Sequence, residues 1–137
     1  MLRGIDLFVV DVQDVGARYY TFVWTAAFSL RACARAGVPV LVLDRPNPID
    51  GVHVEGPLVE RSFGSFVGPY PVANRHGMTV GEVLRLVARA ENVEAALEVV
   101  ALEGWSREMV FVTTGLPWAL PSPNMPTVNT ALVYPGA

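Results

Sequence analysis

Three segments of the chain concentrate carboxylates, amides, guanidinium groups and phenols: residues 11–21, residues 44–48 together with 55–57, and residues 121–126. Groups of these kinds can bind sugar hydroxyls through paired hydrogen bonds, and aromatic rings can stack on the apolar faces of a sugar. This composition indicates a carbohydrate site in which carboxylates are also available for acid–base chemistry.

The side chains that this hypothesis singles out lie in these segments or next to them. The candidate catalytic carboxylates are Asp14, Asp11 and Glu55. The candidate substrate-binding side chains are Gln13, Arg18, Tyr19, Asp44, Asn47, His76, Ser122 and Asn124.

Several of these residues also have a structural interpretation, which the sequence leaves open. Asp11 and Asp14 can cap the following helix or accept hydrogen bonds from backbone amides in a turn. Arg18 can be the ion-pair partner of either carboxylate. Asp44 can likewise form a local salt bridge with Arg45, although burying both charges at a strand end would be costly.

Other kinds of site have no support in the sequence. His53 and His76 share no metal-ligand spacing, so no metal and no cofactor are expected. The chain has no G-x-S-x-G elbow, no G-x-G-x-x-G fingerprint and no Walker motif, which disfavours a serine hydrolase and a nucleotide-binding Rossmann module. Its ten basic residues are all Arg and are scattered, and the net charge is −3, so a nucleic-acid partner is not expected.

The elements that must position these segments follow from the apolar pattern. Apolar runs at residues 5–12, 38–43 and 97–102 are typical of buried strands, and helical periodicity covers residues 20–36 and 80–90. Strand, helix and strand in succession form a βαβ unit, which predicts parallel strands. Ligands of such sheets bind outside the carboxyl ends of the strands. Polar residues that follow the first two strands should therefore cluster at one edge: Asp11, Asp14, Asp44 and Asn47.

The whole chain, residues 1–137, is predicted to be one partial Rossmann-like α/β domain, a parallel sheet with flanking helices. A long loop at residues 45–78 contains aromatic residues and is expected to be ordered. A Pro-rich loop covers residues 113–127, followed by a short helix that ends near residue 133. The hydrophobic content of 52% is typical of a sheet covered on both faces, or of a piece that has lost part of its covering.

Three strands are fewer than most sheets contain, and neither end of the chain resembles the end of a domain. We therefore expect this chain to be a fragment of a longer protein. The first residues do not resemble a signal peptide, and no apolar stretch approaches the ~20 residues that span a bilayer. The compartment (secreted, periplasmic or cytoplasmic) and the oligomeric state stay open. Cys33, the single cysteine, is expected to be a small buried hydrophobe.

Several motifs in order along the chain carry a family resemblance. They are D-V-Q-D-V-G-A-R-Y-Y-T at 11–21, L-D-R-P-N-P at 43–48, V-E-G-P at 54–57, S-F-V-G at 65–68, R-H-G-M-T at 75–79, G-L-P-W at 115–118, P-S-P-N-M-P at 121–126 and A-L-V-Y-P-G at 131–136. Together they resemble the NamZ-type exo-β-N-acetylmuramidases, glycoside hydrolase family 171, formerly known as domain of unknown function 1343.

The resemblance implies a two-domain enzyme, with a Rossmann-like N-terminal domain, that removes N-acetylmuramic acid from the non-reducing end of peptidoglycan fragments. In the family, a Pro-Glu-His-Gly motif upstream supplies the favoured catalytic acid, and this motif is not among the 137 residues. The resemblance therefore implies that this chain alone is inactive. The three candidate carboxylates would act as base or as positioning groups, and the polar candidates would contact a muropeptide. The alternative is a non-catalytic lobe that binds muropeptides or sugars with the same loops.

Overall fold

Three parallel strands form an open sheet, with β2 (Val40–Leu43) between β1 (Phe8–Val10) and β3 (Leu97–Val100). This computed structural model describes residues 2–93 and 96–137. The α/β class and the parallel pairing that the sequence predicts are confirmed.

The outer strands are shorter than the apolar runs that predicted them. The ladder between β1 and β2 extends only from Phe8, opposite Val40, to Val10, opposite Val42. In the described part of the chain β1 pairs with β2 alone, and residues 5–7 and 11–12 of the predicted run lie outside this ladder.

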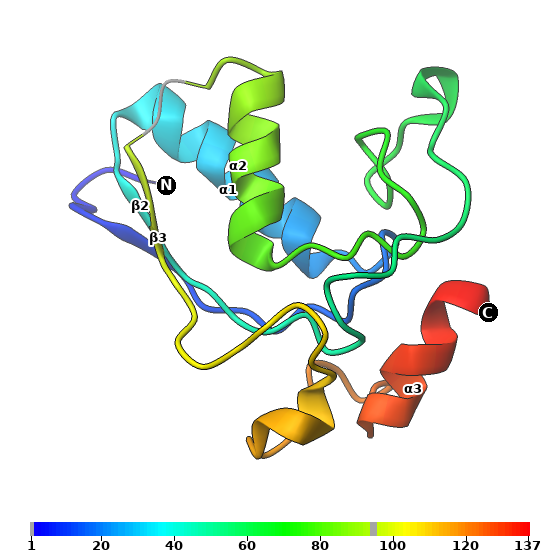
Figure 1. Cartoon of the computed structure of the whole chain (residues 1–137). Helices are drawn as coiled ribbons and strands as arrows, with labels where there is room; N and C mark the ends of the chain where they lie inside the picture. The colour runs from blue at the N-terminus through cyan, green and yellow to red at the C-terminus, as the bar shows by residue number, and fades with distance from the viewer. Residues whose placement is uncertain (1, 94–95) are drawn as a thin grey trace.

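Two helices cover one face of the sheet: α1 (Phe22–Ala36), which connects β1 to β2, and α2 (Val80–Ala90), which precedes β3 (Figure 1). The main core lies between these helices and the strands. Its fully buried members include Val23, Trp24, Leu30, Cys33, Val40, Val42, Val83, Leu84 and Val87. Cys33 is thus the buried hydrophobe that the sequence predicts.

Local sequence signals set the ends of both helices. α1 ends at Gly37, which has the left-handed backbone (φ 69°) that glycine adopts without strain, and its N–H binds the Ala34 carbonyl. α2 begins with the predicted capping box, in which the Thr79 side chain accepts from the Glu82 N–H and the Glu82 carboxylate accepts from the Thr79 N–H.

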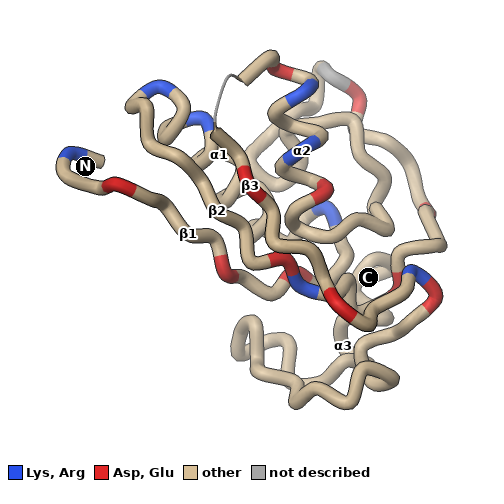
Figure 2. Tube along the Cα trace, turned by 60° about the vertical axis from the view of Figure 1, so that its left-hand side comes forward, with Lys and Arg blue, Asp and Glu red and all other residues tan. Residues whose placement is uncertain are grey.

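The opposite face of the sheet carries apolar side chains that the described residues leave exposed. The exposed fractions are 47% for Leu7, 48% for Val9, 37% for Leu43 and 47% for Val100. Figure 2 shows this side, with the strands in front of both helices. Parallel sheets in folded proteins are normally covered on both faces, and here the helices cover one.

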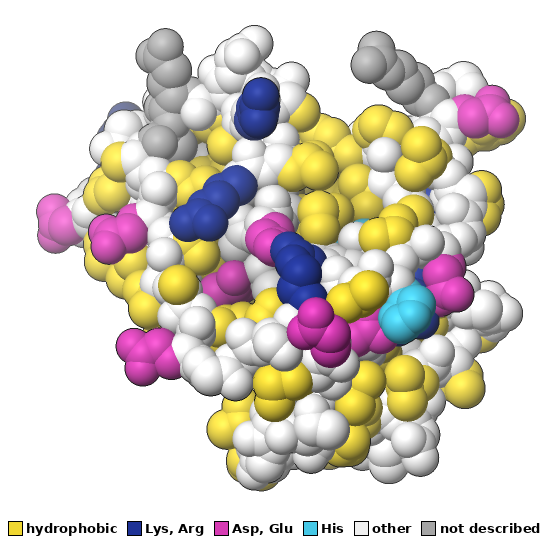
Figure 3. All heavy atoms as spheres, in the orientation of Figure 1, with side chains coloured by type: hydrophobic (Ala, Val, Ile, Leu, Met, Phe, Trp, Pro, Cys, Tyr) yellow, Lys and Arg dark blue, Asp and Glu magenta, His cyan; other side chains and the backbone are white. Residues whose placement is uncertain are grey.

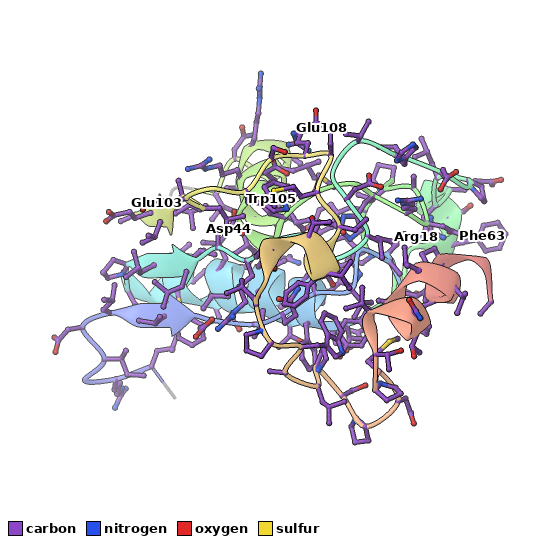
Figure 4. The ribbon with its side chains drawn as sticks, turned by 60° about the horizontal axis from the view of Figure 1, so that its bottom comes forward. Arg18, Asp44, Phe63, Glu103, Trp105 and Glu108 are labelled. Carbon is purple, nitrogen blue, oxygen red and sulfur yellow. The ribbon has the colours of Figure 1, made fainter. Side chains whose placement is uncertain are left out.

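The segment of residues 45–78 leaves the sheet beyond β2 and returns to begin α2, with one short 3-10 helix, η1 (Arg61–Phe63). Arg18 holds its two limbs together, since Nη1 donates to the carbonyls of Pro57 (2.7 Å) and Val72 (2.6 Å). At its outer end the Phe63 side chain is 75% exposed (Figure 4).

The C-terminal part builds a second, smaller core beside the end of β1. It contains η2 (Phe111–Thr114), α3 (Val128–Val133) and η3 (Tyr134–Gly136), so the predicted short helix is confirmed. The buried members of this core are Val15, Ala17, Tyr20, Ile49, Met125 and Ala131. None of the helices in the described ranges is long and apolar enough to cross a membrane.

Candidate functional site

The loops that follow β1 and β2 meet at one edge of the sheet, as the parallel arrangement predicts. The Gln13 amide donates to the Pro46 carbonyl (3.0 Å) and to the Asp14 carbonyl (2.8 Å). Arg45 Nε donates to Asp11 Oδ1 at 2.6 Å. These bonds join the two loops directly, so a ligand at this edge would contact both.

Residues 76–79, just before α2, reach the same edge and bind three of the predicted site residues. His76 Nε2 lies 3.2 Å from Asp14 Oδ2, the Met78 carbonyl accepts from the Asn47 amide (2.9 Å), and the Thr79 hydroxyl donates to Asp44 Oδ2 (2.7 Å). The sequence suggested His76 as a substrate donor or a turn residue. The structure places it among the groups that fix these loops.

Asp14 and His76 form a buried pair, with 3% and 4% of each residue exposed. Asp14 Oδ2 also accepts from the Gly16 N–H (2.8 Å), the turn interaction that the sequence left open. The Met78 N–H donates to His76 Nδ1, so this ring nitrogen is the acceptor and Nε2 carries the proton that faces Asp14. Neither side chain reaches solvent.

The second oxygen of the Asp14 carboxylate, Oδ1, is buried and has no hydrogen-bond partner in the described part of the chain. The same holds for the buried Tyr20 hydroxyl. Burial raises the pKa of the Tyr20 phenol, the Ser122 side chain opposes that rise, and the Asp14 carboxylate adds to it. Two predicted site residues, Asp14 and Ser122, therefore both act on the pKa of this phenol.

Asp44 occupies the start of α2 (Figure 4). Its carboxylate accepts from the Gly81 N–H (2.9 Å) as well as from Thr79, and a Cβ on Gly81 would lie 2.9 Å from Asp44 Oδ2. A helix N-terminus favours an anion, and here the protein's own carboxylate fills that place. This further disfavours a nucleotide phosphate at this position.

Asn47 is 1% exposed, and its side chain turns inward. Its amide nitrogen donates to the Met78 carbonyl, and its Oδ1 accepts from the Ile49 N–H at 3.1 Å. A Cβ on Gly16 would lie 2.6 Å from Asn47 Oδ1, so the two loops approach closely only because residue 16 is glycine.

A pocket of about 260 Å³ opens at the end of β1. Its polar lining residues are Asp11, Gln13 and Arg45, and its apolar lining residues are Val12, Phe22, Phe111, Pro117, Ala119, Leu120 and Pro121. Asp11 and Arg45 are each 44% exposed at the side chain. The hydrogen bond from Arg45 to Asp11 raises the pKa of the guanidinium, which stays charged at neutral pH.

Glu55 lies in a different pocket, of about 540 Å³, together with Asn74, Arg75 and the chain near η3. Arg75 stands between two carboxylates, 2.8 Å from Glu55 Oε2 and 2.6 Å from Asp50 Oδ2. The structure therefore does not bring Glu55 into the pocket of Asp11. Nothing in the sequence pattern singled out Asp50 and Arg75 as residues of the site. Only their contacts between the loops do so.

Charges of both signs lie among apolar side chains on the face that Figure 3 shows. Burial tends to raise the pKa of Asp50, but hydrogen bonds from the backbone and ring of His53, from the Val52 N–H and the charge of Arg75 lower it below its ordinary value. Asp50 is therefore a charged carboxylate that organises the start of the 45–78 segment.

The remaining predicted residues have structural or exposed positions. Arg18 binds backbone carbonyls and is not the partner of Asp11 or Asp14, so that interpretation is wrong. The Tyr19 hydroxyl donates to the Tyr134 carbonyl. The Ser122 carbonyl accepts from the Met125 N–H, and Asn124 is exposed at the surface of the Pro-rich loop.

Comparisons with known proteins show the family of the chain. The family model "Exo-beta-N-acetylmuramidase NamZ, N-terminal" matches residues 1–129. The chain belongs to the NamZ family. It is 48% identical over 135 residues to the peptidoglycan beta-N-acetylmuramidase NamZ of Bacillus subtilis (strain 168), and this match covers 98% of the chain and 33% of that protein.

Crystal structures of two DUF1343 family proteins from Bacteroides fragilis NCTC 9343 have the same fold. One has a TM-score of 0.91 at 39% identity and the other a TM-score of 0.82 at 31% identity. The matches cover 98% and 95% of this chain but 35% and 36% of those proteins. The chain thus spans about a third of the length of the NamZ relatives it matches, as a partial domain of their fold.

Proposed function

We propose that the full-length protein is an exo-β-N-acetylmuramidase that releases N-acetylmuramic acid from the non-reducing end of peptidoglycan fragments. The observation that carries this proposal is the 48% identity to the Bacillus subtilis enzyme along 98% of the chain. The pocket beside Asp11 supports it, because it combines a charged pair and an amide with apolar and aromatic walls, the chemistry that a sugar requires.

The three candidate carboxylates differ in what they can do. Asp11 is exposed and paired with Arg45, Asp14 is buried against His76, and Glu55 is paired with Arg75 in its own pocket. We infer that they position the substrate or the loops, and that the general acid comes from a part of the protein outside these 137 residues. A glycosidase needs such an acid to protonate the leaving oxygen.

The test is hydrolysis of a chromogenic N-acetylmuramic acid glycoside by the full-length protein and by the 137-residue chain. We expect turnover by the first and none by the second, because a general acid typically contributes ~10²–10⁴-fold in rate. Turnover by the short chain at the full-length rate would instead assign the acid to Asp14, Asp11 or Glu55.

The second candidate function is a non-catalytic sugar-binding lobe. It is favoured by the pairing of all three carboxylates, since each lies against Arg45, His76 or Arg75 in the described structure. A full-length protein that binds N-acetylmuramic acid but hydrolyses none of its glycosides would support this function over the first.

A further inference from the structure

The pocket at the end of β1 contains one charged pair and one amide, that of Gln13, on otherwise apolar walls. Among the described residues that line it, Arg45 is the one cation and Asp11 the one anion. Two aromatic rings, Phe22 and Phe111, form the apolar walls together with aliphatic residues and prolines, most of them from the Pro-rich loop. A ligand that fits this pocket would combine an apolar surface with a group that a guanidinium binds.

Asp11 holds Arg45 in a way that leaves one edge of the guanidinium available. The bond runs from Arg45 Nε to Asp11 Oδ1 at 2.6 Å. Within residues 2–93 and 96–137, the terminal nitrogens Nη1 and Nη2 of Arg45 have no hydrogen-bond partner. Two parallel N–H donors at a fixed spacing match the two oxygens of a carboxylate.

The other arginines near the loops are differently engaged. Arg18 donates to two backbone carbonyls, and Arg75 lies between Asp50 and Glu55. Arg107 donates to the carbonyls of Gly51 and Gly77 and pairs with Glu82. Arg45 is therefore the arginine of these loops that combines a position in the pocket with an open pair of donors.

We propose that Arg45 binds the carboxylate of the substrate through Nη1 and Nη2, with Asp11 as the residue that positions it. This inference rests on the proposed function, in which the carboxylate is that of the lactyl group of N-acetylmuramic acid. N-acetylglucosamine lacks this group, so Arg45 would set the preference for the muramic sugar. The apolar walls would receive the less polar parts of the same sugar.

The experiment measures binding of three ligands to the full-length protein by calorimetry: N-acetylmuramic acid, its methyl ester and N-acetylglucosamine. Esterification removes the charge and keeps the rest of the sugar. For Arg45→Gln we expect affinity for the acid to fall by roughly 10–100-fold, the range of a charge-assisted hydrogen bond, with little change for the ester. For Arg45→Lys, which keeps the charge and loses the paired donors, we expect an affinity for the acid between those of the wild-type protein and Arg45→Gln.

Arg85→Gln is the matched control, because Arg85 is exposed on α2 and does not line the pocket. It removes the same charge and should leave all three affinities unchanged. Circular dichroism of each variant shows whether it is folded. If Arg45→Gln weakens the acid and the ester equally, or weakens neither, Arg45 does not bind the carboxylate and the inference is wrong.

Failure of the inference and failure of the proposed function give different results. Turnover of the muramic glycoside by the wild-type protein, together with an unselective Arg45→Gln variant, would reject the inference alone. A selective loss of acid binding in Arg45→Gln, together with no turnover by the wild-type protein, would reject the proposed enzymatic function. It would keep Arg45 as a carboxylate-binding residue.

Discussion

His76 Nε2 lies 3.2 Å from Asp14 Oδ2, and this buried contact joins two loops that are 62 residues apart in the sequence. With Met78 bound to the other ring nitrogen, the histidine connects the loop after β1 to the start of α2. Buried side chains that do not reach solvent therefore hold the loops around the pocket in place.

Asp14→Asn tests this connection. An amide oxygen in the place of Asp14 Oδ2 can accept from both the Gly16 N–H and His76, but these bonds lose the charge of the carboxylate, and the amide NH₂ takes the buried place of Oδ1, which has no hydrogen-bond partner among the described residues. We expect the free energy of unfolding to fall by about 1–3 kcal/mol in urea denaturation. Asp6→Asn, at an exposed position, is the control and should change it by less than about 0.5 kcal/mol. Equal small effects at both positions would show that the Asp14 pair does not stabilise the fold.

Arg18→Lys distinguishes a structural arginine from the binding arginine. A lysine ammonium cannot reproduce the planar donor geometry by which Arg18 holds Pro57 and Val72. We expect a loss of about 1 kcal/mol in stability and an equal loss of affinity for N-acetylmuramic acid and N-acetylglucosamine. A selective loss for the muramic ligand would instead place Arg18 on the carboxylate.

Gly81→Ala should destabilise the protein, although alanine is the better helix former by about 1 kcal/mol. A Cβ at residue 81 would lie 2.6 Å from Val99 Cγ1 and 2.9 Å from Asp44 Oδ2. Relief of these contacts must move α2 away from β3, and we expect a net loss of about 1–3 kcal/mol. Gly136→Ala, where a Cβ meets nothing within 4 Å, serves as the control in the same thermal unfolding measurement.

Val9→Thr and Val42→Thr compare the two faces of the sheet. Val42 is fully buried under the helices, and an added hydroxyl there should reduce stability by about 1–3 kcal/mol. Val9 is 48% exposed, so in the 137-residue chain the same change should have an effect below about 0.5 kcal/mol. Repeating Val9→Thr in the full-length protein shows whether another part of the protein covers this face, since a larger loss is expected only if it does.

Asp50 predicts a pH dependence of stability. Its pKa is lower in the folded protein than the ordinary value of 3.8, so the unfolded chain binds its proton first as the pH falls. The stability that Asp50 contributes is therefore fully present above that ordinary pKa and is lost as the pH falls below it through the folded value. Asp50→Asn should flatten the curve of unfolding free energy against pH in this acidic window. An unchanged curve would contradict the prediction.

The sequence by itself determined the elements and their order, because these depend on local signals. Gly37 ends α1, Thr79 and Glu82 begin α2, and apolar runs on either side of a helix produce parallel strands. Parallel strands end at one edge, so the sequence also predicted that the polar loops would meet there. Its motifs also identified the family, because they can be read directly from the order of the residues.

Only the tertiary structure decided which charges pair, because the partners come from segments far apart in the chain. Arg45 binds Asp11, 34 residues away, and does not form the local salt bridge with the adjacent Asp44. Asp44 instead holds the start of α2, 37 residues further on at Gly81. A charged side chain binds whichever opposite charge or polar group the packed loops place within reach, and this depends on how the helices and loops pack against the sheet.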